Sequence, residues 1–225
     1  MTRPRPCLCS GSEREKARWP WNCSPDNNWW TPRTETYPAS DLLRPGDILL
    51  FAPLQPTFIE KIIQQQQLRW DALPEHARFT HAAIYVGLDH LICESVPQGG
   101  VRYSTLDARL DHSCCVVRRW PGLTPEQGQR IAYRAVSHLG EPYGWGTILA
   151  QFLKLGSLLS EEAAEQMICS RLCDRAITRA LIDHGFPVQQ VSLHSKPGTF
   201  VTPAVLSLSP KLADVEVEWR RCVIC

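Results

Sequence analysis

The order of the expected secondary structure constrains this chain more than any other feature of its sequence. Short β-rich runs dominate the first half, beginning with residues 48–51 and continuing through a hairpin over residues 80–95. Amphipathic helical patterns dominate the second half. Strands followed by helices, with short links and no regular alternation between them, indicate an α+β fold with an antiparallel sheet.

Local patterns place the individual elements. Apolar residues from Phe58 recur at helical spacing before four glutamines, which we interpret as a solvated helix end. Ser104 or Thr105 is expected to cap a short helix, and Thr124 begins another with a Thr-x-x-Gln capping box and a proline at the first position. A further apolar helical stretch covers residues 148–159. The predicted strands are residues 48–51, 80–87, 91–95, 99–103, 114–120 and 215–219.

A thiol stands at the start of the last long helix. Cys169 opens an amphipathic pattern that Gly185 and Pro187 bring to an end. A cysteine in the first helical turn lies beside unpaired backbone N–H groups and the positive end of the helix dipole, and both favour the nucleophilic thiolate. One face of this helix is apolar, and its members are Leu172, Ala176, Ile177, Ala180 and Leu181.

Composition excludes several classes of protein. The net charge of +1 over 225 residues gives no reason to expect a nucleic acid as the main partner. No apolar run is long enough for a membrane span, and no apolar segment follows the N-terminal arginines and prolines as in a secretory signal peptide. We therefore expect synthesis in the cytoplasm, with the 10 cysteines largely reduced.

The chain is expected to divide into an irregular Trp- and Cys-rich arm at residues 1–40 and a catalytic domain at residues 41–225. The tryptophans of the arm are interpreted as packing area, with stacking on a ligand as the alternative. The arm cysteines Cys7, Cys9 and Cys23 match no common zinc spacing, so no metal is expected. Their disulfide state stays open, as does that of Cys222 and Cys225.

Three side chains have the chemistry of a nucleophilic site. Cys169 supplies a thiol, His81 a base on a predicted strand, and Glu94 on the next strand a group that can orient the imidazole. By strand alternation His81 and Glu94 can face the same side. A metal site of Cys169, Cys173 and His81 is the alternative, although a fourth ligand is not obvious.

Several motifs together resemble the circularly permuted branch of the NlpC/P60 papain-like superfamily, the branch that includes YiiX and lecithin:retinol acyltransferase-like enzymes. In that branch the histidine strand precedes the cysteine helix, as it does here. The resemblance covers about residues 41–210. Its motifs in chain order are Gly46-Asp47-Ile48-Leu49, Thr80-His81-Ala82-Ala83-Ile84-Tyr85-Val86, Cys93-Glu94-Ser95 with Gly99-Gly100-Val101, Leu139-Gly140-Glu141-Pro142-Tyr143, Ile168-Cys169-Ser170 and Val201-Thr202-Pro203.

The resemblance implies a papain-like core in which Cys169 is the nucleophile, His81 the base and Glu94 the third polar member. It implies a cysteine amidase or endopeptidase that acts through a thioester on peptidoglycan stem peptides and needs no cofactor. A cell-wall substrate would require export by a dedicated secretion system to a target periplasm, with an immunity or carrier protein as partner. A thiol acyltransferase or lipid-ester hydrolase is the alternative enzyme, and a non-catalytic binding module is the alternative outside enzymes.

Three further residues are candidates for substrate or oxyanion contacts. Ser170 follows the nucleophile, Tyr85 shares the strand face of His81, and Asp47 follows a turn glycine. Each also has an alternative structural role: Ser170 as a polar residue at the helix start, Tyr85 as a core residue and Asp47 as a turn residue. The terminal run from Cys222 to Cys225 has the form of a prenylation box, or the two cysteines pair in an oxidising space.

Overall fold

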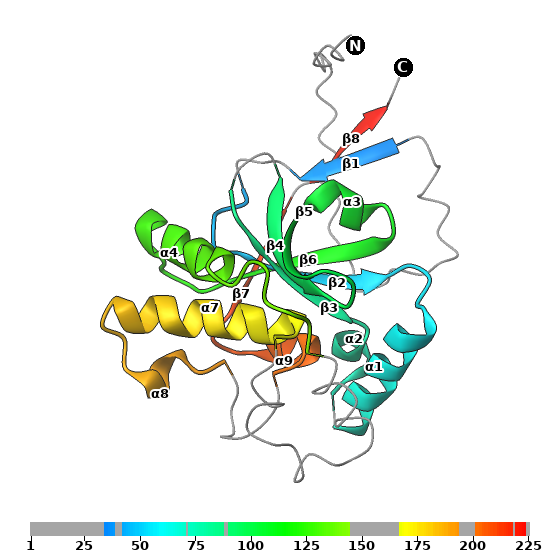
Figure 1. Ribbon diagram of the computed structural model, residues 1–225. Helices are drawn as coiled ribbons and strands as arrows, with labels where there is room; N and C mark the ends of the chain where they lie inside the picture. Colours follow the sequence, from blue (N-terminus) through cyan, green and yellow to red (C-terminus); the bar gives the residue numbers. More distant parts are fainter. Residues whose placement is uncertain are drawn as a thin grey trace.

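A six-stranded antiparallel sheet forms the centre of the part of the chain that the structure describes (Figure 1). The structure is a computed structural model, and it describes residues 34–38, 42–70, 72–87, 90–144, 167–193, 201–217 and 219–223, the first and last of these ranges by their backbone only. The sheet order is β5-β4-β3-β2-β6-β7, and every neighbouring pair is antiparallel. The strands are β2 (Ile48–Pro53), β3 (His81–Tyr85), β4 (Leu91–Val96), β5 (Gly100–Thr105), β6 (Ser113–Arg119) and β7 (Ala213–Val215).

Helices cover both faces of this sheet, so the α+β class is confirmed. Alternate residues of β2 and β3 enter two separate apolar clusters, as the two-residue period of a strand requires. One cluster packs against α4 (Pro125–Val136) and α7 (Cys169–Asp183), and the other packs against α3 (Leu106–Leu110) (Figure 1). The central strands β2 and β3 carry few polar residues because both of their faces are buried.

The predicted helix starts are confirmed by their caps. Thr124 and Gln127 form a complete capping box at the start of α4, with proline at the first position. Thr105 caps α3 by accepting a hydrogen bond from the backbone N–H of Ala108. The apolar face predicted for α7 is buried along its whole length, and α7 ends at Asp183 before Gly185 at φ +84°.

The glutamine run was interpreted wrongly as a solvated helix end. Helix α1 (Phe58–Arg69) continues through it, and the two buried residues of this helix are Gln66 and Gln67. The Gln67 amide donates to the carbonyls of Ala77 and Phe79, at 2.9 Å each, and accepts from the backbone N–H of Ala204 at 2.9 Å. This side chain therefore connects α1 to the segment before β3 and to the start of α9 (Pro203–Leu208).

The two chain ends form a small ladder of their own. Strand β1 (Thr34–Pro38) pairs antiparallel with β8 (Trp219–Val223). Residues 34–38 are therefore a regular strand within the arm predicted to be irregular; the rest of the arm lies outside the described residues. The strand predicted at 215–219 is also wrong, because β7 ends at Val215 and β8 begins at Trp219. The helix predicted at 148–159 and the C-terminal residues 224–225 lie outside the described residues.

The remaining short helices are α2 (Pro74–Ala77) and α8 (Val188–Val191). Helix α2 contacts α1 and α9, and α8 contacts α7. Within the described ranges, no helix combines the length and the apolar character that crossing a bilayer requires.

Gly100 is a position where a side chain cannot fit. Its φ is +64°, and an added Cβ would overlap the carbonyl oxygen of Glu141. This close approach lets the turn at Gly140 and Glu141 pair with Val101 of β5 through two hydrogen bonds of 2.9 Å. The glycine therefore fixes the loop that leads to Tyr143.

We expect Gly100→Ala to lower the free energy of unfolding by at least about 3 kcal/mol, because backbone strain and overlap with a carbonyl add. Gly122→Ala is the matched control, since Gly122 has φ +74° but open space around it. That variant should lose only about 1 kcal/mol of backbone strain. Urea unfolding of both variants measures the difference, and equal losses would contradict the close approach.

Candidate active site

The start of α7 holds Cys169 in a buried, hydrogen-bonded position. Ile168 is the N-cap and provides no side-chain cap, so the first-turn amides remain directed outward from the helix start. Cys169 is 6% exposed. Its sulfur accepts hydrogen bonds from the backbone N–H groups of Ser170 and Ala82. The first of these belongs to α7 and the second to β3.

The residues on both sides of Cys169 are anchored. The Met167 carbonyl accepts from the Ser95 hydroxyl at 3.0 Å and from the backbone N–H of Gly144 at 2.9 Å. The Ser170 hydroxyl donates to the Val201 carbonyl at 2.7 Å and is fully buried. The start of α7, which carries Cys169, is therefore held by contacts from β4, from the loop after α4 and from the segment before α9.

His81 is the first residue of β3 and lies between Cys169 and Glu94. Its Nε2 is 2.9 Å from the Glu94 Oε2, and the ring also hydrogen-bonds the Cys169 side chain. The Phe51 ring on β2 lies 5.9 Å from the imidazole, centroid to centroid. A Cys–His–carboxylate series is thereby complete, with each member on a different element.

Glu94 is the most enclosed member of the series. It is fully buried on β4, where its cross-strand neighbours are Ala83 and Arg102. The Arg102 Nε and Nη2 lie 3.3 and 3.2 Å from its Oε1. The Arg109 Nε and Nη2 lie 2.7 and 2.6 Å from its Oε2. Both carboxylate oxygens therefore have charged donors, as a buried charge requires.

These contacts favour an ion pair. Burial raises the pKa of the Cys169 thiol, but the hydrogen bond and charge of His81 and the two backbone amides outweigh it and bring that pKa below its ordinary value. Burial lowers the pKa of His81, but Cys169 and Glu94 raise it above its ordinary value. Burial likewise opposes ionisation of Glu94, yet His81 and Arg109 lower its pKa to about 2.

The other buried cysteines show what burial does without a cationic partner. Burial, followed by the charge of Glu94, raises the pKa of Cys93 to about 12. Burial raises the pKa of Cys115 and of Cys173 well above the ordinary range for thiols. Among the described cysteines with a shifted pKa, Cys169 is the one whose thiolate is favoured.

The three further candidates have structural contacts. The Ser170 hydroxyl binds the Val201 carbonyl, so its contribution to the site is its backbone N–H. Tyr85 is 3% exposed and packs in the apolar cluster beneath α3. The Asp47 carboxylate is buried, accepts from Arg119 at 2.6 and 2.7 Å and from the backbone N–H of Arg44 at 2.8 Å. Asp47 therefore closes a turn rather than lining the site.

Sequence reasoning missed Arg102, Arg109 and the effect of the Cys169 charge on Tyr143. Burial and the Cys169 charge raise the pKa of the Tyr143 phenol, which keeps it neutral. Arg102 could be found only from the register of β4 and β5, where it faces Glu94. Arg109 has no sequence signal, because its approach to Glu94 depends on how α3 folds back on the sheet.

Among the residues that the structure describes, no group of three or more histidine, cysteine, aspartate or glutamate side chains is arranged to hold a metal ion. The alternative metal site of Cys169, Cys173 and His81 therefore finds no support there. Cys173 is fully buried in the apolar cluster between α7 and the sheet. Cys7, Cys9 and Cys23 lie outside the described ranges.

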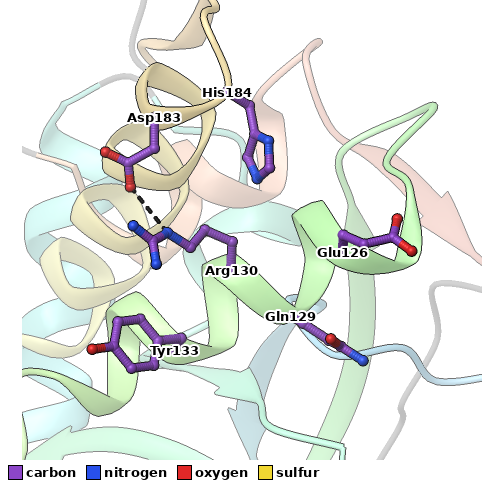
Figure 2. A pocket seen from close by; sticks show the side chains of 6 residues that line it. All are labelled: Glu126, Gln129, Arg130, Tyr133, Asp183 and His184. Carbon is purple, nitrogen blue, oxygen red and sulfur yellow. Dashed lines mark hydrogen bonds and ion pairs between the residues drawn. The ribbon is translucent and has the colours of Figure 1, made fainter.

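A surface hollow lies at the other end of α7 (Figure 2). It has a volume of about 440 Å³ and is lined by Glu126, Gln129, Arg130, Tyr133, Asp183 and His184. The Arg130 guanidinium points to the Asp183 carboxylate, 3.2 Å away (Figure 2). Since α7 has 15 residues, this hollow is roughly 20 Å from Cys169. It belongs to a surface ion-pair group and not to the cysteine site.

Comparison with known proteins identifies a solved structure of similar fold. No protein-family model matches the chain, and no curated protein matches it. The chain is similar to the crystal structure of metalloprotein yiiX from Escherichia coli O157:H7, with a TM-score of 0.53 and 24% sequence identity. The match covers 79% of this chain and 98% of the other. The chain therefore has a YiiX-like α+β fold.

Proposed function

We propose that this protein is a cysteine hydrolase of the circularly permuted NlpC/P60 papain-like type, with Cys169 as nucleophile, His81 as base and Glu94 as the group that orients His81. The observation that carries the proposal is the continuous hydrogen-bonded series from the Cys169 sulfur through His81 to the Glu94 carboxylate. The raised pKa of Cys93, Cys115 and Cys173 supports it, because an inert buried thiol in this core behaves differently from Cys169.

The reaction begins with attack of the Cys169 thiolate on an amide carbonyl carbon. The carbonyl π electrons move to oxygen, and the backbone N–H groups at the uncapped start of α7 are suited to stabilise that negative charge. His81 carries the proton of the thiol and transfers it to the leaving nitrogen as the C–N bond breaks. A thioester on Cys169 remains.

The second step restores the enzyme. His81, now neutral, removes a proton from water or from an amine as that acceptor attacks the thioester carbonyl. The C–S bond breaks, and the Cys169 thiolate and the His81 imidazolium form again. Water gives a hydrolase and an amine gives an acyltransferase, so the acceptor decides between the two alternatives.

The proposed substrate is the stem peptide of peptidoglycan. This choice of substrate is based on the family resemblance. We propose that the enzyme reaches the cell wall of a target cell as an effector delivered by a secretion system. Lipid acyl chemistry on the same fold is the alternative enzyme activity, and it would use the same thioester.

The description of yiiX as a metalloprotein raises a metal-dependent alternative. The described residues at the cysteine site do not fit a metal ion. Both oxygens of Glu94 are engaged by Arg102 and Arg109, and a dication beside two guanidinium groups would be repelled. The His81 Nε2 faces the same carboxylate. The proposed reaction therefore uses only the side chains and backbone of this chain.

Mass analysis of peptidoglycan fragments tests the proposal. The wild type is expected to cut stem peptides, and Cys169→Ala to lose at least about 10⁴-fold in rate because the thioester cannot form. Cys173→Ala, one helical turn away, is the control and should retain the activity. An added amine that appears in the product would identify a transferase.

Two outcomes would count against the proposal. Cleavage that Cys169→Ala leaves intact would remove the thiol mechanism. Intact stem peptides together with Cys169-dependent cleavage of a lipid ester would replace the cell-wall substrate by the lipid one.

A further inference from the structure

Helix α3 has few residues and is firmly fixed to the sheet. Leu106 is fully buried and Leu110 is 8% exposed, and both pack in the apolar cluster with Phe51 and Tyr85. The backbone N–H of Leu106 donates to the His90 carbonyl at 2.8 Å. These contacts fix the position from which the Arg109 side chain reaches Glu94.

Arg109 and His81 share one carboxylate oxygen. The Glu94 Oε2 lies 2.9 Å from the His81 Nε2 and 2.6 and 2.7 Å from two nitrogens of Arg109. Arg102 instead contacts Oε1, at 3.2 and 3.3 Å, and its side chain is 49% exposed against 28% for Arg109. Arg109 is therefore the closer and the less solvated of the two cations.

Four charged groups from four elements contact the His81 imidazole directly or through Glu94. They are Cys169 on α7, Glu94 on β4, Arg109 on α3 and Arg102 on β5, while Phe51 on β2 contributes an apolar ring. Cys169 and Glu94 both stabilise the imidazolium, and the positive charge of Arg109 opposes it. Of the two cations, Arg109 is the one that binds the same Glu94 oxygen as His81, so it limits most directly how strongly Glu94 retains the proton on His81.

We propose that Arg109 is a positioning residue for the reaction: by binding the oxygen of Glu94 that contacts His81, it fixes the carboxylate and moderates its pull on the imidazole proton. This inference rests on the proposed function of the cysteine site. It assigns to α3 a role in proton transfer, since a His81 that holds its proton too firmly is a poor acid for the leaving group.

The experiment measures the pH profile of kcat/KM, together with kcat, KM and the rate of iodoacetamide alkylation at Cys169, in the full-length protein. The upper pH limit of kcat/KM reports loss of the His81 proton, because His81 must be protonated to act as the acid for the leaving group. In Arg109→Gln we expect this limit to rise by about half to one pH unit, because a repelling charge and a competing donor are removed. We expect kcat to fall about tenfold with KM within about twofold.

Three variants control the experiment. Arg109→Lys retains the charge without the two-nitrogen fork and should shift the limit less than Arg109→Gln in the same direction. Arg102→Gln removes the more exposed cation on the other oxygen and should give less than half the shift. Arg134→Gln removes a comparable ion pair with Asp183 on the far surface, at 2.5 Å, and should leave the pH profile unchanged.

The outcomes separate this inference from the function on which it rests. The positioning role alone would be overturned by two results together. Cys169 of the wild type would be alkylated rapidly below the ordinary thiol range, and the Arg109 variants would keep the wild-type kcat and the wild-type upper pH limit. A lowered thermal midpoint with an unchanged profile would do the same and show a purely structural role. Slow, ordinary alkylation of Cys169 in the wild type would overturn both. If Arg109→Gln does not fold, Arg109→Lys decides by the same two readouts.

Discussion

Replacing His81 by alanine is expected to slow cleavage about 10³–10⁴-fold while the protein remains folded. The imidazole forms the cationic half of the pair with Cys169 and later donates a proton to the leaving group. Without it, burial dominates and the pKa of Cys169 should rise above its ordinary value, as burial does for Cys93. Initial rates at saturating substrate measure the loss.

A histidine outside the site supplies the control. His138 contacts the Glu141 carboxylate through its Nδ1 at 2.6 Å, so it is also a histidine with a carboxylate partner. His138→Ala should retain nearly all the activity. If His81→Ala retained activity within about tenfold of the wild type, the base would have to be another group.

Replacing Glu94 by glutamine is expected to remove a large, pH-dependent part of the stability. The pKa of Glu94 is about 2 in the folded protein against an ordinary value of 4.5. A lowered folded-state pKa stabilises the protein above pH 4.5, and this stabilisation is lost as the pH falls towards 2. At 1.36 kcal/mol per pH unit the contribution is about 3 kcal/mol.

The raised pKa of His81 does not obscure this effect. Its contribution is fully present below the ordinary histidine value and is lost only as the pH rises through the folded value. Between pH 5 and pH 2 it is therefore constant, at about its full size. Denaturant unfolding across this interval should show a slope in the wild type that Glu94→Gln lacks.

An exposed carboxylate supplies the comparison for Glu94. Asp183 binds Arg130 and Arg134 at the surface, and such pairs contribute little to stability. Asp183→Asn should leave the acid slope in place. Identical slopes in the wild type and Glu94→Gln would show that Glu94 is not held as a buried anion.

Local patterns predicted most elements of the fold, since their causes lie within a few residues. The capping box at Thr124 and the apolar face of α7 are sequence-local, and both are confirmed. The buried Gln67 was missed because its three partners lie on other segments of the chain. The β1–β8 ladder was missed for the same reason, as it joins the two ends of the chain.

The sequence predicted the three side chains of the candidate site but not the charged residues around them. The order of the motifs around His81, Glu94 and Cys169 pointed to one site, and the structure brings these three side chains together. The charges that control Glu94 come from Arg102 and Arg109, whose roles depend on strand register and on the placement of α3. Ser170, Tyr85 and Asp47 have the structural contacts that the sequence left open as alternatives.

Alkylation of the wild type with iodoacetamide over a range of pH, resolved by peptide mass, tests the ion pair most directly. We predict that Cys169 reacts with a midpoint below the ordinary thiol pKa of 9.0 while Cys93 and Cys173 stay unmodified, and that His81→Ala removes this difference. A Cys169 that reacts no faster than those two buried cysteines at neutral pH, with or without His81, would contradict the account.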